Sequence, residues 1–231
     1  SSAASDVYKR QGTITGHDDR VWCLSFEPNR NELLATCSSD KTVKIWKMMM
    51  VRDDDDDDDD DAMMALCPRC VCTLDGVHER TIRSVAWSPC GKWLLTGAID
   101  GAATVWDTCT RRPVKVLRDH AHYIQGVCWD PLGNYLATAS SDRSLKVYEL
   151  PPKWHASKKN LKTTTVRWWT DPHEIPQKKG KKTAEEPKAK PRSALFASET
   201  AHASFFRRLC ASADGSLIIA PGAASKDNAK G

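Results

Sequence analysis

The stretches VWCLSFEPNRNELLATCSSDKTVKIW (residues 21–46), IRSVAWSPCGKWLLTGAIDGAATVW (82–106) and IQGVCWDPLGNYLATASSDRSLKVY (124–148) are variants of one pattern. Each has an apolar run, a turn with Pro, a second apolar run, an Asp, and a third run that ends in Trp or Tyr. Short runs rich in β-branched and aromatic residues, separated by turn residues, are typical of β-strands. The sequence therefore predicts an all-β fold built from copies of one antiparallel unit.

A His precedes each copy, the Asp follows it after 22 or 23 residues, and the Trp or Tyr follows six residues later. Self-similarity at a period near 40 that ends in Trp is the signature of WD40 repeats, each of which forms a four-stranded blade of a β-propeller. The chain resembles this family, and we expect an incomplete WD40 β-propeller of about three and a half blades. The three sets are His17, Asp40 and Trp46; His78, Asp100 and Trp106; and His120, Asp142 and Tyr148.

The resemblance implies a structural role for these sets. In WD40 blades the His, a strand Ser or Thr and the Trp form a buried chain of hydrogen bonds to the Asp, and each orphaned group costs about 1–3 kcal/mol. No nucleotide, hydrolase or metalloprotease motif is present, so we expect no enzyme activity. The Ser or Thr of the network could be Thr36 or Ser38 in the first copy and Thr138 or Ser140 in the third. In the second copy it is Thr96.

An insertion separates the first two copies. His17 to His78 spans 61 residues and His78 to His120 spans 42, and the surplus lies in residues 47–66. Nine consecutive aspartates in it cannot enter a core, so we expect a disordered loop on the face opposite the His and Asp loops. It is either a plain solvated loop or a binding element for basic partners such as histones. The residues are Asp53, Asp54, Asp55, Asp56, Asp57, Asp58, Asp59, Asp60 and Asp61.

Composition divides the rest of the chain. Residues 12–150 are expected to hold the three blades, and residues 151–194, rich in Lys and Pro, a linker or loop. Its KKGKK tract is either plain linker or a nuclear-import or nucleic-acid patch. Residues 195–231 repeat the start of a blade, and we expect a partial fourth blade there. Residues 1–11 resemble a translated sequencing adapter and are set aside as a cloning scar.

The cysteines indicate neither disulfides nor cofactors. The chain has nine cysteines. Because repeat proteins of this type are intracellular, where thiols stay reduced, we do not expect a disulfide framework. Strand cysteines such as Cys23 and Cys37 behave as small hydrophobic residues. The one ligand-like spacing joins Cys67, Cys70 and Cys72, which without a second pair is weak evidence for a metal. We expect no cofactor, and no apolar run is long enough for a membrane helix.

Longer stretches of the sequence resemble two more narrowly defined families. HYIQGVCWDPLGNYLATASSDRSLKVY and SFFRRLCASADGSLIIAPG, within residues 112–222, resemble the WD40 subunit of chromatin assembly factor 1 and its Hir-type relatives. This resemblance implies a nuclear scaffold that binds histones H3–H4 and other chromatin assembly factor subunits during replication-coupled nucleosome assembly. Direct nucleic-acid binding is left open. Arg207 and Arg208 are candidate partner-binding residues if exposed.

The first half resembles another family. RVWC and RTIRSVAWSPCG, within residues 14–107, are similar to strings of the cytosolic iron–sulfur assembly WD40 adaptor. This resemblance implies a cytoplasmic scaffold for iron–sulfur targeting proteins, which is the alternative to the histone chaperone. A generic WD40 interaction module is a third possibility. The change of resemblance between Trp106 and His120 leaves open a chimera of two transcripts.

Overall fold

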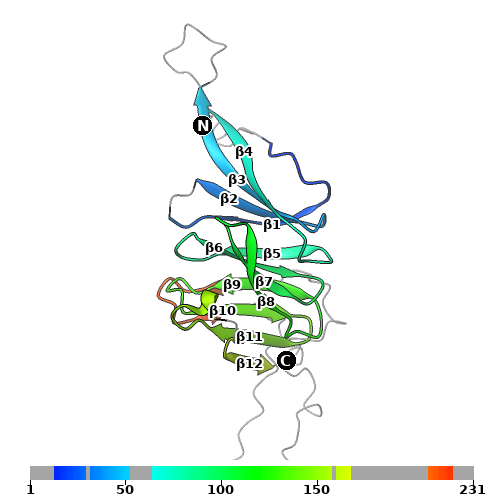
Figure 1. The fold of residues 1–231 in the computed structure, drawn as a ribbon, viewed down its shortest axis with the longest axis vertical. Helices are drawn as coiled ribbons and strands as arrows, with labels where there is room; N and C mark the ends of the chain where they lie inside the picture. The colour runs from blue at the N-terminus through cyan, green and yellow to red at the C-terminus, as the bar shows by residue number, and fades with distance from the viewer. Residues whose placement is uncertain (1–12, 30–31, 53–63, 158–159, 168–207, 221–231) are drawn as a thin grey trace, which may run out of the picture.

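The computed structural model describes residues 13–29, 32–52, 64–157, 160–167 and 208–220. They form three four-stranded antiparallel sheets, stacked side by side, and one two-stranded ladder (Figure 1). In each sheet the strands pair in chain order, which is the arrangement of a propeller blade. The all-β prediction and the incomplete WD40 propeller are confirmed.

The strands begin and end close to the predicted runs. The first sheet contains β1 (Val21–Phe26), β2 (Leu33–Ser38), β3 (Val43–Arg52) and β4 (Met64–Leu74). The second contains β5 (Ile82–Trp87), β6 (Trp93–Ala98), β7 (Ala103–Asp107) and β8 (Arg112–Leu117). The third contains β9 (Ile124–Trp129), β10 (Tyr135–Ser140), β11 (Ser144–Glu149) and β12 (Thr163–Arg167), and the ladder pairs β13 (Cys210–Ala211) with β14 (Ile218–Ile219).

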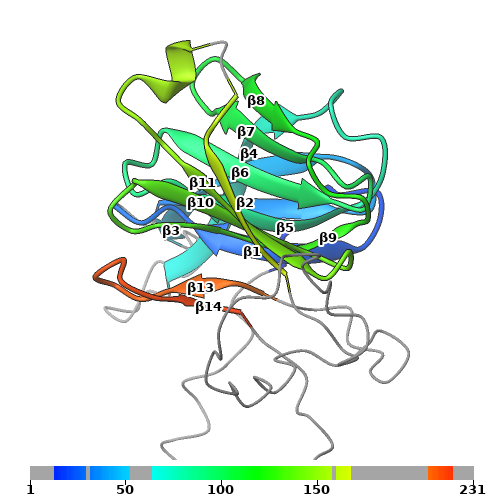
Figure 2. The same cartoon turned by 90° about the horizontal axis from the view of Figure 1, so that it is seen from below.

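Hydrophobic clusters join successive blades. The first strands of neighbouring blades are in contact, β1 with β5 and β5 with β9, and Figure 2 shows them along one side of the stack. Val85 and Trp87 of β5 pack against the first blade and are 5% and 6% exposed. The equivalent residues of β1, Leu24 and Phe26, are 57% and 47% exposed. Blades thus bury one another's faces, and the described residues leave one face of the first blade uncovered.

The ladder continues the repeat. Leu209, immediately before β13, packs with Cys128 and Ala137 of the third blade in a small core cluster. Gly215 follows with a φ of 69°, the same value as Gly91 in the corresponding turn of the second blade. The ladder therefore has the arrangement of the first hairpin of a blade, and residues 195–207 and 221–231 lie outside the described residues.

The insertion differs from its prediction as a loop over residues 47–66. Both strands run far into it, and ladder pairs continue from Met48 opposite Pro68 to Arg52 opposite Met64. Because β2 pairs with β3 only as far as Lys47, the two strands project beyond the sheet as a separate ribbon (Figure 1). The flanking residues are mostly Met and Ala, which have no strong strand preference, so the pairing of the two strands outweighs local composition here. The run of aspartates itself lies outside the described residues.

The expected linker at 151–194 is also partly structured. A short 3₁₀ helix, η1 (Trp154–Ala156), buries Trp154 against Trp93 and Trp129, with ring centroids 5.4 and 6.0 Å away. Beyond it, β12 pairs with β11 and completes the third blade. The three blades therefore extend past residue 150, because the long connection supplies the fourth strand. The KKGKK tract lies outside the described residues, and so do residues 1–11.

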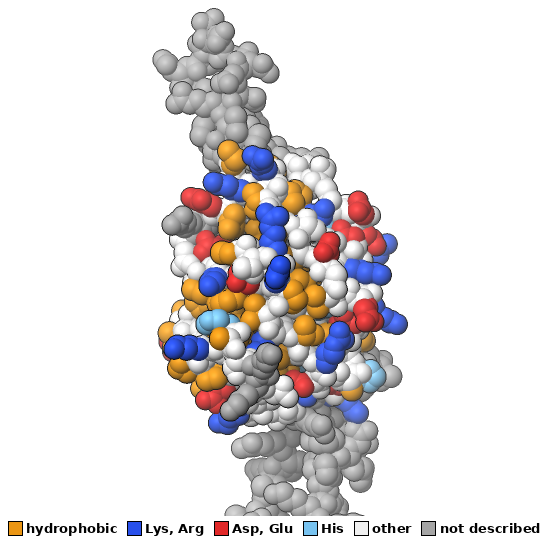
Figure 3. Space-filling view, viewed as in Figure 1, with side chains coloured by type: hydrophobic (Ala, Val, Ile, Leu, Met, Phe, Trp, Pro, Cys, Tyr) orange, Lys and Arg blue, Asp and Glu red, His pale blue; other side chains and the backbone are white. Residues whose placement is uncertain are grey.

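The face of the molecule seen in Figure 3 is not dominated by one charge. In Figure 3, Lys and Arg side chains are interspersed with acidic and hydrophobic ones. Within the part of the chain that the structure describes, no helix is long and apolar enough to cross a membrane.

Candidate functional site

Three hydrogen-bonded networks stand at one end of the blades. In the first blade, Nδ1 of His17 lies 2.7 Å from Oδ2 of Asp40, and Nε2 lies 2.7 Å from Oγ1 of Thr36. Trp46 donates its indole N–H to the same hydroxyl at 2.8 Å. The open choice is thereby decided for Thr36, since Ser38 instead donates to the backbone oxygen of Asp19.

The second and third blades repeat this geometry. His78 contacts Asp100 at 3.0 Å and Thr96 at 2.8 Å, and Trp106 donates to Thr96 at 2.9 Å. In the third blade His120 contacts Asp142 at 2.8 Å and Thr138 at 2.8 Å. Tyr148 replaces the Trp and is 1% exposed, and burial raises the pKa of its phenol.

The aspartates of these networks are held ionised. Burial alone would favour the neutral acid, but hydrogen bonds from Thr42 and His17 outweigh it and lower the pKa of Asp40 to about 2. The pKa values of Asp100 and Asp142 are lowered too, again against burial, chiefly by bonds from His78 and His120. Each carboxylate also accepts a backbone N–H two residues later, which fixes the turn between the second and third strands. In each network a Thr hydroxyl lies beside the His, as in a nucleophile–base pair, but these hydroxyls are buried. The networks therefore connect the strands inside each blade.

A second repeated feature lies at the inner edge of the same end. The pairing of each inner strand shifts near its second residue, at Trp22, Arg83 and Gln125. Such bulges re-aim side chains. The guanidinium of Arg83, in the second blade, lies over the indole of Trp22, in the first, at 3.9 Å from the ring centroid. Trp22 in turn donates to Ser39 at 2.6 Å, so a cation–π pair is fixed across two blades.

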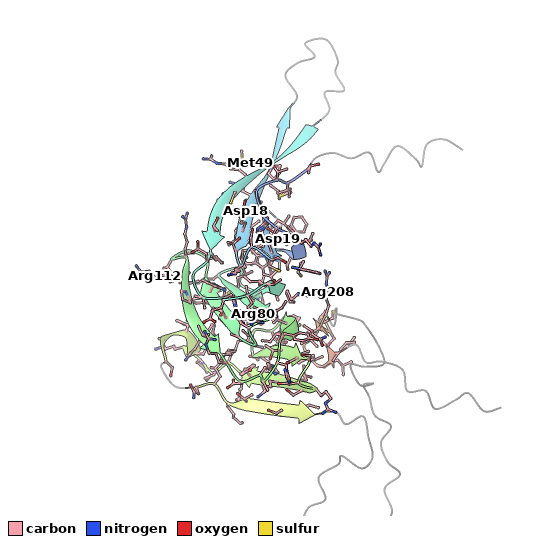
Figure 4. The ribbon with its side chains drawn as sticks, turned by 90° about the vertical axis from the view of Figure 1, so that its right-hand side faces the viewer. Asp18, Asp19, Met49, Arg80, Arg112 and Arg208 are labelled. Atoms are coloured by element: carbon pink, nitrogen blue, oxygen red, sulfur yellow. The ribbon has the colours of Figure 1, made fainter. Side chains whose placement is uncertain are left out.

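Exposed charges lie in the loops that precede the two strands carrying this pair. Asp18, Asp19 and Arg80 are exposed residues in the loops that carry the His residues, and Figure 4 shows them with Arg208. Arg208 is exposed, as the sequence hypothesis requires, and its Nη2 donates to the backbone oxygen of Trp22 at 3.2 Å. We call the surface formed by Asp18, Asp19, Trp22, Arg80, Arg83 and Arg208 the loop face.

Arg112, in contrast, lies at the opposite edge of the blades from Arg208 (Figure 4). The sequence hypothesis did not single out Trp22 or Arg83. The signal available was their shared place in the repeat, five residues after each His.

The remaining candidates are not brought together. Asp53–Asp61 and Arg207 lie outside the described residues. Cys70 is exposed and Cys72 is buried on β4, while only the backbone of Cys67 is described. Burial raises the pKa of Cys72, which opposes the thiolate that a metal needs. Among the described residues no three His, Cys, Asp or Glu side chains form a metal-ligand group.

Stacked four-stranded blades, each fastened by a His–Asp–Thr network, define a WD40-repeat β-propeller. The chain belongs to the CAF1B/HIR1 beta-propeller domain family, which it matches over residues 5–230. That match extends across both segments that resemble different families in the sequence.

Individual relatives match a smaller part of the chain. The probable cytosolic iron-sulfur protein assembly protein Ciao1 of Culex quinquefasciatus is 38% identical over 94 residues, which is 41% of this chain and 23% of that protein. Protein CIA1 of Arabidopsis thaliana is 33% identical over 99 residues, which is 40% of this chain and 24% of that protein. The chain thus spans about a quarter of the length of these relatives.

A solved structure, that of U3-55K, is similar with a TM-score of 0.50 and 17% identity, over 65% of this chain and 40% of that one. At this identity the likeness concerns the fold alone. Both family resemblances seen in the sequence are confirmed. The relatives' names favour the iron–sulfur assembly alternative, and they do not support the histone-binding, nuclear expectation.

Proposed function

We propose that this chain is a non-catalytic scaffold that binds protein partners at its loop face. The Trp22–Arg83 pair carries the proposal, because Trp and Arg are the residues most enriched among binding hot spots. The pair is fixed by two blades and by Ser39, so little side-chain entropy would be lost on binding. The charges around it would set partner choice and association rate.

The partners proposed first are cytosolic iron–sulfur targeting proteins, which would place the chain in the cytoplasm. Support comes from the names of the relatives that match about two fifths of the chain. In this function the cluster is cargo that the partners carry, and the scaffold brings donor and acceptor proteins together. No cluster ligand in the chain is needed for that task.

The second candidate is a nuclear histone H3–H4 chaperone scaffold. The match of residues 5–230 to the CAF1B/HIR1 propeller family favours it. The acidic run would bind basic histones by charge, and such binding would weaken steeply with salt. The two candidates therefore differ in both partner and salt dependence.

The test compares three forms of the purified chain: wild type, Trp22→Ala on the loop face, and Arg112→Ala at the opposite edge as the matched control. Each is titrated with reconstituted cytosolic iron–sulfur targeting proteins and, separately, with H3–H4 at two salt concentrations. We expect Trp22→Ala to weaken targeting-protein binding at least about tenfold and Arg112→Ala to leave it unchanged. Salt-sensitive binding of H3–H4 alone would select the second candidate. Equal losses in both variants would refute the loop face as the binding surface.

A further inference from the structure

Two free cysteines face each other inside the first blade. Cys23 lies in β1 and Cys37 lies directly opposite it in β2. Both belong to the hydrophobic cluster between the first and second blades, where Cys23 is 7% exposed and Cys37 is fully buried. The Sγ atom of Cys23 also lies 4.0 Å from the backbone oxygen of Val85 in the next blade.

The backbone places these two thiols within bonding range. Directly opposite residues of antiparallel strands have Cα atoms about 4.5 or 5.5 Å apart, depending on the type of pair. Disulfides span Cα separations of about 4.4–6.8 Å. A bond between Cys23 and Cys37 therefore requires rotation of side chains and no displacement of a strand.

The surroundings make the two thiols unequal. The contact with Cys37 lowers the pKa of Cys23 to about 6, and burial opposes this shift. The positive charge of Arg208 adds to the lowering, and its guanidinium is tied to the backbone oxygen of Trp22, the residue before Cys23. The same contact and burial raise the pKa of Cys37. Cys23, the less buried thiol, is thus the nucleophile, and Cys37 remains protonated beside it.

We propose that Cys23 and Cys37 form a redox modification site, at which hydrogen peroxide converts the two thiols to a cross-strand disulfide. The Cys23 thiolate attacks one peroxide oxygen, so an S–O bond forms, the O–O bond breaks and hydroxide leaves as water after taking a proton. Cys37 then attacks the sulfur of the resulting sulfenic acid: the S–S bond forms, the S–O bond breaks, and the leaving hydroxide takes the Cys37 proton and departs as a second water. In sum, two thiols lose two hydrogens and one peroxide becomes two waters. A small-molecule dithiol reverses the change by thiol–disulfide exchange.

The other blades show why the site belongs to the first. The equivalent opposed pairs are Ser84 with Gly97 and Gly126 with Ala139. Small residues stand there because the next blade packs closely: a Cβ on Gly97 would lie 2.6 Å from methyl groups of Ile124 and Val127. Two thiols satisfy the same restriction on size and add a reaction that the other pairs lack.

The sequence allows a direct test on the whole chain. Trypsin cleaves after Arg20, Arg30 and Lys41, so Cys23 and Cys37 fall in separate peptides, residues 21–30 and 31–41, with one cysteine each. After peroxide treatment, unfolding and alkylation, we expect these peptides as one linked species with the mass of the pair minus two hydrogens. Reduction before alkylation should return two alkylated peptides. If both cysteines are alkylated after peroxide treatment, or if Cys23 links to another cysteine, the proposal is overturned.

Two variants separate the steps. Cys23→Ser copies Ser84, the equivalent residue of the next blade. Cys37→Ser removes the second thiol but keeps a hydroxyl that can donate to Cys23, so the contact that lowers the pKa of Cys23 is retained. Cys37→Ser should accumulate sulfenic acid at Cys23 that dimedone traps, whereas Cys23→Ser should leave Cys37 unoxidised. Cys90→Ser, which removes an exposed thiol, is the matched control and should still give the linked peptides. Absence of dimedone adduct in Cys37→Ser would contradict Cys23 as the reacting thiol.

Discussion

The network of the second blade allows a test of how much these hydrogen bonds contribute to the stability of the fold. Thr96 and Thr104 are opposed on neighbouring strands, and both are fully buried. The Thr96 hydroxyl lies 2.8 Å from Nε2 of His78 and accepts the indole N–H of Trp106 at 2.9 Å. The Thr104 hydroxyl has no hydrogen-bond partner among the described residues. Replacement of either by Val keeps the shape and the β-branched backbone preference, and removes one hydroxyl.

The expected effects differ in size and sign. Thr96→Val leaves two buried polar groups without partners, at about 1–3 kcal/mol each, so the free energy of unfolding should fall by about 2–6 kcal/mol. Thr104→Val removes a buried hydroxyl that the described residues do not satisfy, so stability should stay within about 0.5 kcal/mol or rise.

Urea denaturation followed by tryptophan fluorescence measures both, with the midpoint and the m-value reported separately. Two outcomes would refute the network as the fastening of the blade: a loss below about 1 kcal/mol in Thr96→Val, or equal losses in the two variants.

Two further predictions concern pH and blade contacts. Although burial opposes it, hydrogen bonding lowers the pKa of Asp40 to about 2; its stabilising effect is therefore present above the unfolded pKa of about 4 and is lost as the pH falls through the folded value. Urea midpoints measured from neutral to strongly acid pH should fall less steeply in Asp40→Asn than in wild type, and equal slopes would contradict this. Gly91→Ala combines a φ of 69° with collision of the new Cβ with the Glu27 carboxylate, whereas Gly76→Ala has a φ of 77° and open space. Thermal unfolding should show a loss of about 1 kcal/mol for Gly76→Ala and at least about twice that for Gly91→Ala; the reverse order would count against a steric contact between blades.

The sequence by itself determined the fold and the His, Asp and aromatic members of the structural networks. A repeated order of apolar runs, turn residues, His and Asp is read locally, because strands and tight turns depend on residues a few positions apart. This is why β1, β5 and β9 coincide with the predicted runs. The β13–β14 ladder, with Gly215 in its turn, follows the same local pattern.

Tertiary structure decided the features that depend on the burial of side chains and on contacts between blades. Thr36 and Ser38 lie on the same side of one strand, so alternation could not choose between them, and only their distance from His17 and Trp46 did. The strands that flank the aspartates were missed because pairing with a neighbour outweighs local composition. The Trp22–Arg83 pair joins two blades. The opposed thiols of Cys23 and Cys37 lie between blades, so the packing of one repeat on the next gave both features their chemistry.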